Sequence, residues 1–162
     1  MRLLCGVGIV ATILGGSVIG ARTADYLEED FPKSRAYSAG VMTEGGRILW
    51  MAGQTATKDE NGADISGKFD AQVRTIFSHM DKTLKRAGGG LANVVNITVF
   101  INDPRNGERM AELRREAFPE GKYPGSTMIT VSNFAQVGML VEIQGFAVIG
   151  DRCSDSSPCL PR

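Results

Sequence analysis

A carboxylate inside an apolar segment is the residue in this sequence best suited to chemistry. Glu142 lies within residues 139–148, MLVEIQGFAV, which has the composition of a strand. Strands this apolar are usually buried, and a buried ionised carboxylate is costly unless it is paired. Glu142 is therefore either satisfied by neighbouring groups or retained for chemistry with a raised pKa. The alternative is a glutamate at a sheet edge or rim that faces water.

The sequence contains few of the residues that other kinds of catalytic site require. His79 is the only histidine, and none of the three cysteines lies in the expected core. A catalytic triad, a histidine-based metal site and a cysteine nucleophile are therefore not expected. We expect neither a metal nor an organic cofactor. Cys153 and Cys159 lie in a polar tail, where they would pair if the protein is exported and remain free thiols if it is cytosolic.

Length and charge indicate one globular domain that does not bind nucleic acid. The 162 residues suffice for a single core, and 43% of them are hydrophobic. The 18 Lys and Arg residues balance the 18 Asp and Glu residues. No basic stripe with interleaved aromatic residues occurs, so nucleic acid is not an expected partner.

The sequence divides into an apolar leader at 1–24, a folded domain at 30–150 and a polar tail at 151–162. Met1 and Arg2 precede an uncharged run that extends to Ala21, with a small-residue cleavage position after Gly20. A signal peptide, a short membrane anchor and an unused extension all remain open, although five glycines in the run weaken the anchor. The protein would be exported, for instance to the periplasm, if residues 1–20 act as a signal. It would be cytoplasmic if the extension is an artefact.

The elements that must position Glu142 form an expected α+β domain with the order ββαβαββ. We expect a hairpin of strands 36–43 and 47–52, helices at 69–87 and 107–118, and strands at 93–101, 126–131 and 140–148. Apolar residues in the first helix recur at steps of three and four, which gives that helix one buried face. Two helices on one face of a mixed sheet leave the other face uncovered. Oligomerisation is the usual way to hide such a face.

Seven short segments follow one another along the expected elements. The segments are 37–39 (YSA), 51–55 (MAGQT), 72–74 (QVR), 87–89 (AGG), 94–103 (VVNITVFIND), 124–127 (PGST) and 141–144 (VEIQ). No single segment is specific, but the ordered set is. Together they resemble the Rid (RidA/YjgF) family of reactive-intermediate, or enamine/imine, deaminases.

The resemblance implies a chorismate-mutase-like fold that assembles as a homotrimer, with ligand clefts between adjacent subunits. Members hydrolyse small enamines and imines such as 2-aminoacrylate, which releases ammonia and leaves a keto acid, and related members act as aminomuconate-type deaminases. The resemblance also implies the roles of individual residues. Glu142 matches the glutamate that positions or activates water, and Tyr37 matches the tyrosine that lines the cleft. Gly53 and Gln54 match the loop beside the cleft.

The sequence departs from the deaminase branch at two positions. The arginine that branch carries just before the serine of the turn, where it would bind a substrate carboxylate, is represented here by Gly125. Ala52 stands where a serine is expected. Gly125, Ser126 and Thr127 remain expected contributors to substrate binding, through backbone amides and hydroxyls. These departures make 2-aminoacrylate a doubtful substrate and leave Glu142 in place.

Arg114, Arg115 and Lys122 are near the turn in sequence and are candidates to replace the lost charge. We expect them instead to be solvated charges at a helix end. The sequence thus predicts a cofactor-independent enamine or imine deaminase, a hydrolase of C–N bonds. Two alternatives remain, a non-enzymatic ligand-binding or chaperone-like trimer and a hydrolase for a neutral substrate.

Overall fold

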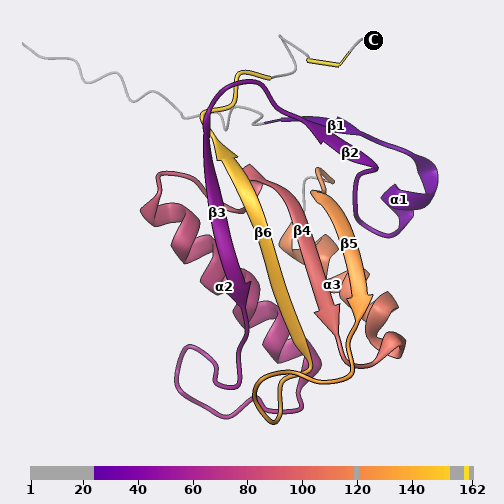
Figure 1. Ribbon diagram of the computed structural model, residues 1–162, viewed down its shortest axis with the longest axis vertical. Coiled ribbons are helices and arrows are strands. Elements are labelled where there is room, and N and C mark those ends of the chain that lie inside the picture. The colour runs from indigo at the N-terminus through magenta and orange to yellow at the C-terminus, as the bar shows by residue number, and fades with distance from the viewer. Residues whose placement is uncertain (1–23, 119–120, 154–158, 161–162) are drawn as a thin grey trace, which may run out of the picture.

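A four-stranded mixed sheet carries two helices on one face (Figure 1). The computed structural model describes residues 24–118, 121–153 and 159–160; the expected leader therefore lies almost wholly outside the described residues. The strand order is β3 (Arg47–Gln54), β6 (Val141–Ile149), β4 (Val94–Ile101) and β5 (Gly125–Thr130), and the helices are α2 (Phe69–Arg86) and α3 (Gly107–Ala117). β6 is antiparallel to both β3 and β4, whereas β4 and β5 are parallel. The expected α+β class is confirmed.

The core lies between the sheet and the two helices. α2 buries Val73, Ile76, Met80 and Leu84 completely, at the spacing of one helical face. The short turns at Leu91–Asn93 and Pro104–Asn106 are 3-10 helices that lead into β4 and α3. No helix among the described residues is both long and apolar enough to span a membrane.

Gln72 is a fully buried polar residue that fixes the start of β6. Its amide nitrogen donates hydrogen bonds to the carbonyls of Ile65 and Gly138, and its side-chain oxygen accepts one from the amide of Leu140. All of its strong hydrogen-bonding groups thus have partners, which is what makes its burial tolerable. The interaction holds the segment that leads into the strand of Glu142.

A separate two-stranded sheet replaces the expected hairpin. β2 (Gly40–Met42) pairs with β1 (Asp25–Leu27), not with β3, and α1 (Asp30–Ser34) lies between them in the chain. The prediction that 36–43 pairs with 47–52 is therefore wrong. The two glycines 45 and 46 have positive φ angles, but they turn the chain from the small sheet into the large one. The order ββαβαββ is found from β2 to β6, preceded by β1 and α1.

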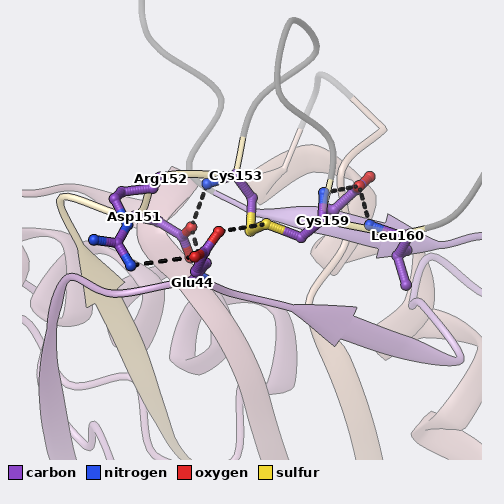
Figure 2. Close-up of a disulfide and its surroundings, with 7 residues drawn as sticks. Glu44, Asp151, Arg152, Cys153, Cys159 and Leu160 are labelled. Carbon is purple, nitrogen blue, oxygen red and sulfur yellow. Dashed lines mark hydrogen bonds and ion pairs between the residues drawn. A yellow bond between two sulfur atoms is a disulfide. The ribbon is translucent and has the colours of Figure 1, made fainter.

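The polar tail is joined to the rest of the fold (Figure 2). Cys153 and Cys159 form a disulfide. The amides of Cys159 and Leu160 both donate to the Asp25 carboxylate in β1, at 3.0 and 3.1 Å. The amides of Glu44 and Cys153 donate to the Asp151 carboxylate, and the Arg152 guanidinium pairs with Glu44. The tail therefore rests on both β1 and the turn after β2.

The sheet face opposite the helices is only partly covered by the described residues: the small sheet packs Tyr26 and Val41 against the Val148 end of this face, and the rest is open. Trp50 and Ile48 on β3 are 72% and 55% exposed. Trp50 lies against Phe146 on β6, with ring centroids 5.0 Å apart. Large exposed aromatic and aliphatic side chains on one sheet face are typical of an interaction surface. We call this face, which carries Ile48, Trp50, Phe146, Phe100 and Glu142, the open face.

Candidate functional site

Glu142 lies on the open face and not in the core. Its neighbours Val141 and Ile143 are fully buried under the helices, and successive strand residues alternate between faces. Glu142 therefore points to the opposite side, directly across from Phe100 of β4. It is half-buried, so the prediction of a carboxylate enclosed in an apolar strand is wrong. Both faces of β6 are rich in apolar residues, which is why the sequence alone suggested burial.

Gly53 and Gln54 lie next to Glu142, as expected for residues of one cleft. A Cβ atom on Gly53 would overlap the Glu142 carboxylate, so only glycine allows the present approach. The pairing of β3 with β6 shifts register between Met51 and Gln54, which brings this turn of chain against Glu142. The Gln54 amide nitrogen donates to the carbonyl of Ala52 at 3.2 Å, so its own carbonyl oxygen is available to a ligand.

Tyr37, Gly125, Ser126 and Thr127 form a second group near the start of β5. Ser38 pairs with Gly125, and its hydroxyl donates to the carbonyl of Tyr123 at 2.6 Å. These bonds fix the segment of Tyr37 against the turn. The four residues, together with Asn96 and part of β2, line a pocket of about 320 Å³. This part of the expected site is brought together by the fold.

Arg114 belongs to this second group, and its expected place in solvent is wrong. The residue is only 3% exposed. Its guanidinium donates to the Ser126 hydroxyl at 2.5 Å and to the Arg35 carbonyl at 2.8 Å, and lies 5.7 Å from the centre of the Tyr37 ring. Arg114 follows the fully buried Met110 by four residues, which places both on the inner face of α3. That spacing was the signal in the sequence.

Burial and like charge both act on Arg114. Desolvation is the larger effect and the nearby Arg35 guanidinium the smaller, and together they lower the pKa of Arg114 to about 10. The group is still protonated at neutral pH. By contrast, Arg115 on the same turn is exposed and donates to the carbonyl of Ser34, so the expectation of a solvated charge is confirmed there.

Ala36 connects Arg35 to Tyr37 in an unusual backbone conformation. Its φ angle is 58°, in the left-handed region, and its side chain is fully buried. It is the one residue other than glycine with a positive φ among those that the structure describes. Such strain is found where the surrounding structure must hold a group in place. Here it directs the Arg35 carbonyl toward Arg114 and Tyr37 toward the pocket.

The two groups of candidate residues are far apart in a single chain. Glu142 pairs with Phe100 in β4, whereas Gly125 pairs with Asn96, four residues earlier in β4, on the other side of that strand. The two positions are two strand spacings apart across the sheet and four residues apart along the strand direction. Together these offsets separate them by about 16 Å. The fold of a single chain therefore does not bring Glu142 to Tyr37 or Ser126. No metal-binding cluster of His, Cys, Asp or Glu occurs within the described part of the chain.

Comparison with known proteins identifies the fold and the family. The family model Endoribonuclease L-PSP matches residues 28–149. A RutC family protein of Pyrococcus horikoshii is 29% identical over 104 residues, which cover 64% of this chain and 81% of the relative. The human 2-iminobutanoate/2-iminopropanoate deaminase is 25% identical over 114 residues, 70% of this chain and 80% of that protein.

The solved structures agree. A conserved Rid family protein of unknown function, YyfB from Yersinia pestis, superposes with a TM-score of 0.66 at 23% identity and covers 75% of this chain and 94% of its own. A YjgF/YER057c/UK114 family member from Mycobacterium tuberculosis, 26% identical, gives 0.55 and covers 78% and 98% of the two chains. The chain therefore belongs to the Rid/YjgF family, which the Endoribonuclease L-PSP model describes.

Proposed function

We propose that this protein hydrolyses a small imine or enamine to the carbonyl compound and ammonia, without a metal or organic cofactor. Glu142, seated against Gly53 on the open face, is the observation that carries the proposal. Glu142 is only half-buried, so water reaches its carboxylate. The name of the human relative, an imine deaminase, supports the same reaction class.

The chemistry requires proton transfers and no further group. Glu142 accepts a proton from a water molecule while the oxygen of that water attacks the carbon of the C=N bond. The proton then passes to nitrogen, which gives a carbinolamine. Glu142 next transfers the hydroxyl proton of the carbinolamine to the same nitrogen, the C–N bond breaks, ammonia leaves and the C=O bond forms. An enamine first takes a proton on carbon, which gives the imine. Tyr37, Ser126 and the backbone amides near Gly125, Thr127 and Gly53 would hold the substrate.

We also propose that the complete site forms between protomers of a homotrimer. The open face presents apolar side chains that need cover, and the two groups of site residues are too far apart in one chain. A neighbour packed on the open face would bring its own Tyr37 group toward Glu142. Light scattering after size exclusion should give three times the mass of the single chain.

The deaminase proposal is tested with an imine made in the assay. We expect the purified protein to accelerate ammonia release from 2-iminopropanoate, generated from alanine by an amino-acid oxidase, and Glu142→Gln to abolish the gain. Glu112→Gln, an exposed residue on α3, is the matched control and should retain it. If no imine or enamine is hydrolysed faster than in buffer, the protein is not a deaminase.

Two other functions remain as outcomes of that test. Ligand binding without turnover would indicate a non-enzymatic trimer. Turnover of uncharged imines alone would indicate a hydrolase for neutral substrates, and Gly125→Arg should then introduce activity on 2-aminoacrylate. RNA cleavage is not proposed, because the 18 basic residues are balanced by 18 acidic ones and the sequence has no excess of positive charge for a phosphate backbone.

A further inference from the structure

A buried positive charge without a negative partner is the least explained feature of this fold. Arg114 is 3% exposed, and no ion pair joins it to an Asp or Glu among the described residues. Its Nε atom is buried and has no hydrogen-bond acceptor. Its two hydrogen bonds go to uncharged oxygens, those of Ser126 and Arg35. A buried cation that is not paired is costly, so its persistence points to an anion that is not part of the chain.

The surroundings of Arg114 form a pocket that such an anion could enter. The pocket measures about 390 Å³ and is lined by Arg35, Tyr37, Gly107, Arg114, Ser126 and Met128, with Phe31 and Ala111. Tyr37 and Ser126 also line the pocket on the other side of β5, so the two spaces share a wall. The Arg114 guanidinium, the Ser126 hydroxyl and the Tyr37 side chain therefore line the same part of the proposed site.

Arg35, the other cation of the pocket, already has a partner. It forms an ion pair with Glu108, which is 76% exposed on the first turn of α3. That carboxylate does not neutralise Arg114, whose hydrogen bonds go to the Arg35 carbonyl and the Ser126 hydroxyl. The net charge that a ligand meets in the pocket is thus that of Arg114.

The hydroxyl of Ser126 transmits this charge to a ligand. Its oxygen accepts a hydrogen bond from Arg114, so its own proton is free to donate elsewhere. Donation from a hydroxyl that is polarised by a cation is stronger than from an isolated one. An anion at the mouth of the pocket would accept from Ser126 and be attracted by the guanidinium behind it.

We propose that Arg114, from α3, determines specificity for a ligand with a carboxylate at the end held by Ser126 and Tyr37. The charge that the turn lacks at Gly125 is then supplied from the helix layer. The buried, unpaired Arg114 supports an anion-binding site by itself. The identification of the anion as a carboxylate depends on the proposed function. Of the three candidates to replace the missing arginine, all expected to be solvated helix-end charges, Arg114 is thus the one that we propose for this role.

Binding of pyruvate to the full-length protein tests this inference separately from catalysis. Calorimetry should show tighter binding of pyruvate than of its uncharged methyl ester. Arg114→Gln should weaken pyruvate about tenfold or more, the usual effect of losing a charged hydrogen-bond partner, and leave the ester unchanged. Arg115→Gln, the exposed neighbour, should change neither. Equal affinity of the wild type for the two probes, or unchanged pyruvate binding by Arg114→Gln, would overturn the proposal.

A second measurement covers the case in which Arg114→Gln does not fold. In the wild-type protein, the Arg114 Nε–H resonance should shift on addition of pyruvate and not on addition of the ester. No shift with pyruvate would refute the site. Pyruvate binding without any imine hydrolysis would retain the anion site and refute the deaminase. Hydrolysis in which Arg114→Gln lowers kcat but leaves KM unchanged would retain the deaminase and refute the site.

Discussion

Gly53 leaves the space that the Glu142 carboxylate occupies. A Cβ atom at position 53 would lie 2.8 Å from the carboxyl carbon of Glu142, inside the contact distance of two carbon atoms. The obstructed atoms are the end of a flexible side chain, so the protein can accommodate a methyl group by moving Glu142 away. Position 53 therefore governs the placement of the proposed catalytic carboxylate more than it governs folding.

Gly53→Ala should lower kcat/KM for imine hydrolysis by at least about tenfold, because small misplacements of a reacting group are costly. Its free energy of unfolding should change by less than about 1 kcal/mol. Gly90→Ala is the control, since a Cβ there meets only an ordinary contact, 3.5 Å from Asp81. An unchanged rate for Gly53→Ala would show that the position of Glu142 is not critical.

Trp50→Glu should dissociate the proposed trimer. Trp50 is 72% exposed on the open face, and a charge there would be desolvated by a packed neighbour. Light scattering over a range of protein concentrations measures the change. Val137→Glu, at a 98% exposed position in the loop before β6, should leave the mass unchanged. An assembly that survives Trp50→Glu would place the interface elsewhere.

Loss of the Cys153–Cys159 disulfide should destabilise the protein by about 2 kcal/mol, the chain-entropy estimate for so short a loop. The sequence separation of the two cysteines is 6 residues. Unfolding in urea of the Cys153→Ser, Cys159→Ser double variant, compared with the oxidised wild type, measures the effect. The reduced wild type should match the double variant. Equal stability of all three proteins would show that the tail does not contribute.

Asp103 should contribute to the loss of stability in acid. Hydrogen bonds from the Arg105 side chain and backbone lower the pKa of Asp103 from 3.8 to about 2. A carboxyl whose folded pKa is depressed stabilises the fold above the unfolded pKa, and this contribution disappears as the pH falls from about 4 to 2. Unfolding measured across that range should show a shallower acid dependence for Asp103→Asn than for the wild type. Identical slopes would contradict the assignment.

The helices and central strands could be predicted from sequence because their periodicity is local. The helix expected at 69–87 is found at Phe69–Arg86, and the strand expected at 93–101 at Val94–Ile101. The pairing of β2 with β1 could not be predicted, because two glycines before a strand suit a hairpin and a crossing between sheets equally well. Strand partners depend on contacts between distant segments, which local pattern does not encode.

The site was predictable in its parts and not in its arrangement. Gly53, Gln54 and Glu142 meet as the resemblance implied, and Tyr37 meets the turn at Gly125. Burial was misjudged in both directions, for Glu142 and for Arg114. An arginine on a short helix is assigned to solvent by composition, and only its spacing from Met110 indicates otherwise.

The left-handed backbone conformation of Ala36 lowers the stability of the fold and helps to position residues of the proposed ligand site. An L-residue in this conformation gives up about 1 kcal/mol of stability relative to glycine. Ala36→Gly would relieve that strain, yet it would also remove a buried methyl group and loosen the link between the Arg35 carbonyl and the Tyr37 ring. A screen for thermal stability alone would therefore not detect the role of Ala36 in positioning the Arg35 carbonyl and the Tyr37 ring, whereas a screen for ligand affinity would detect it.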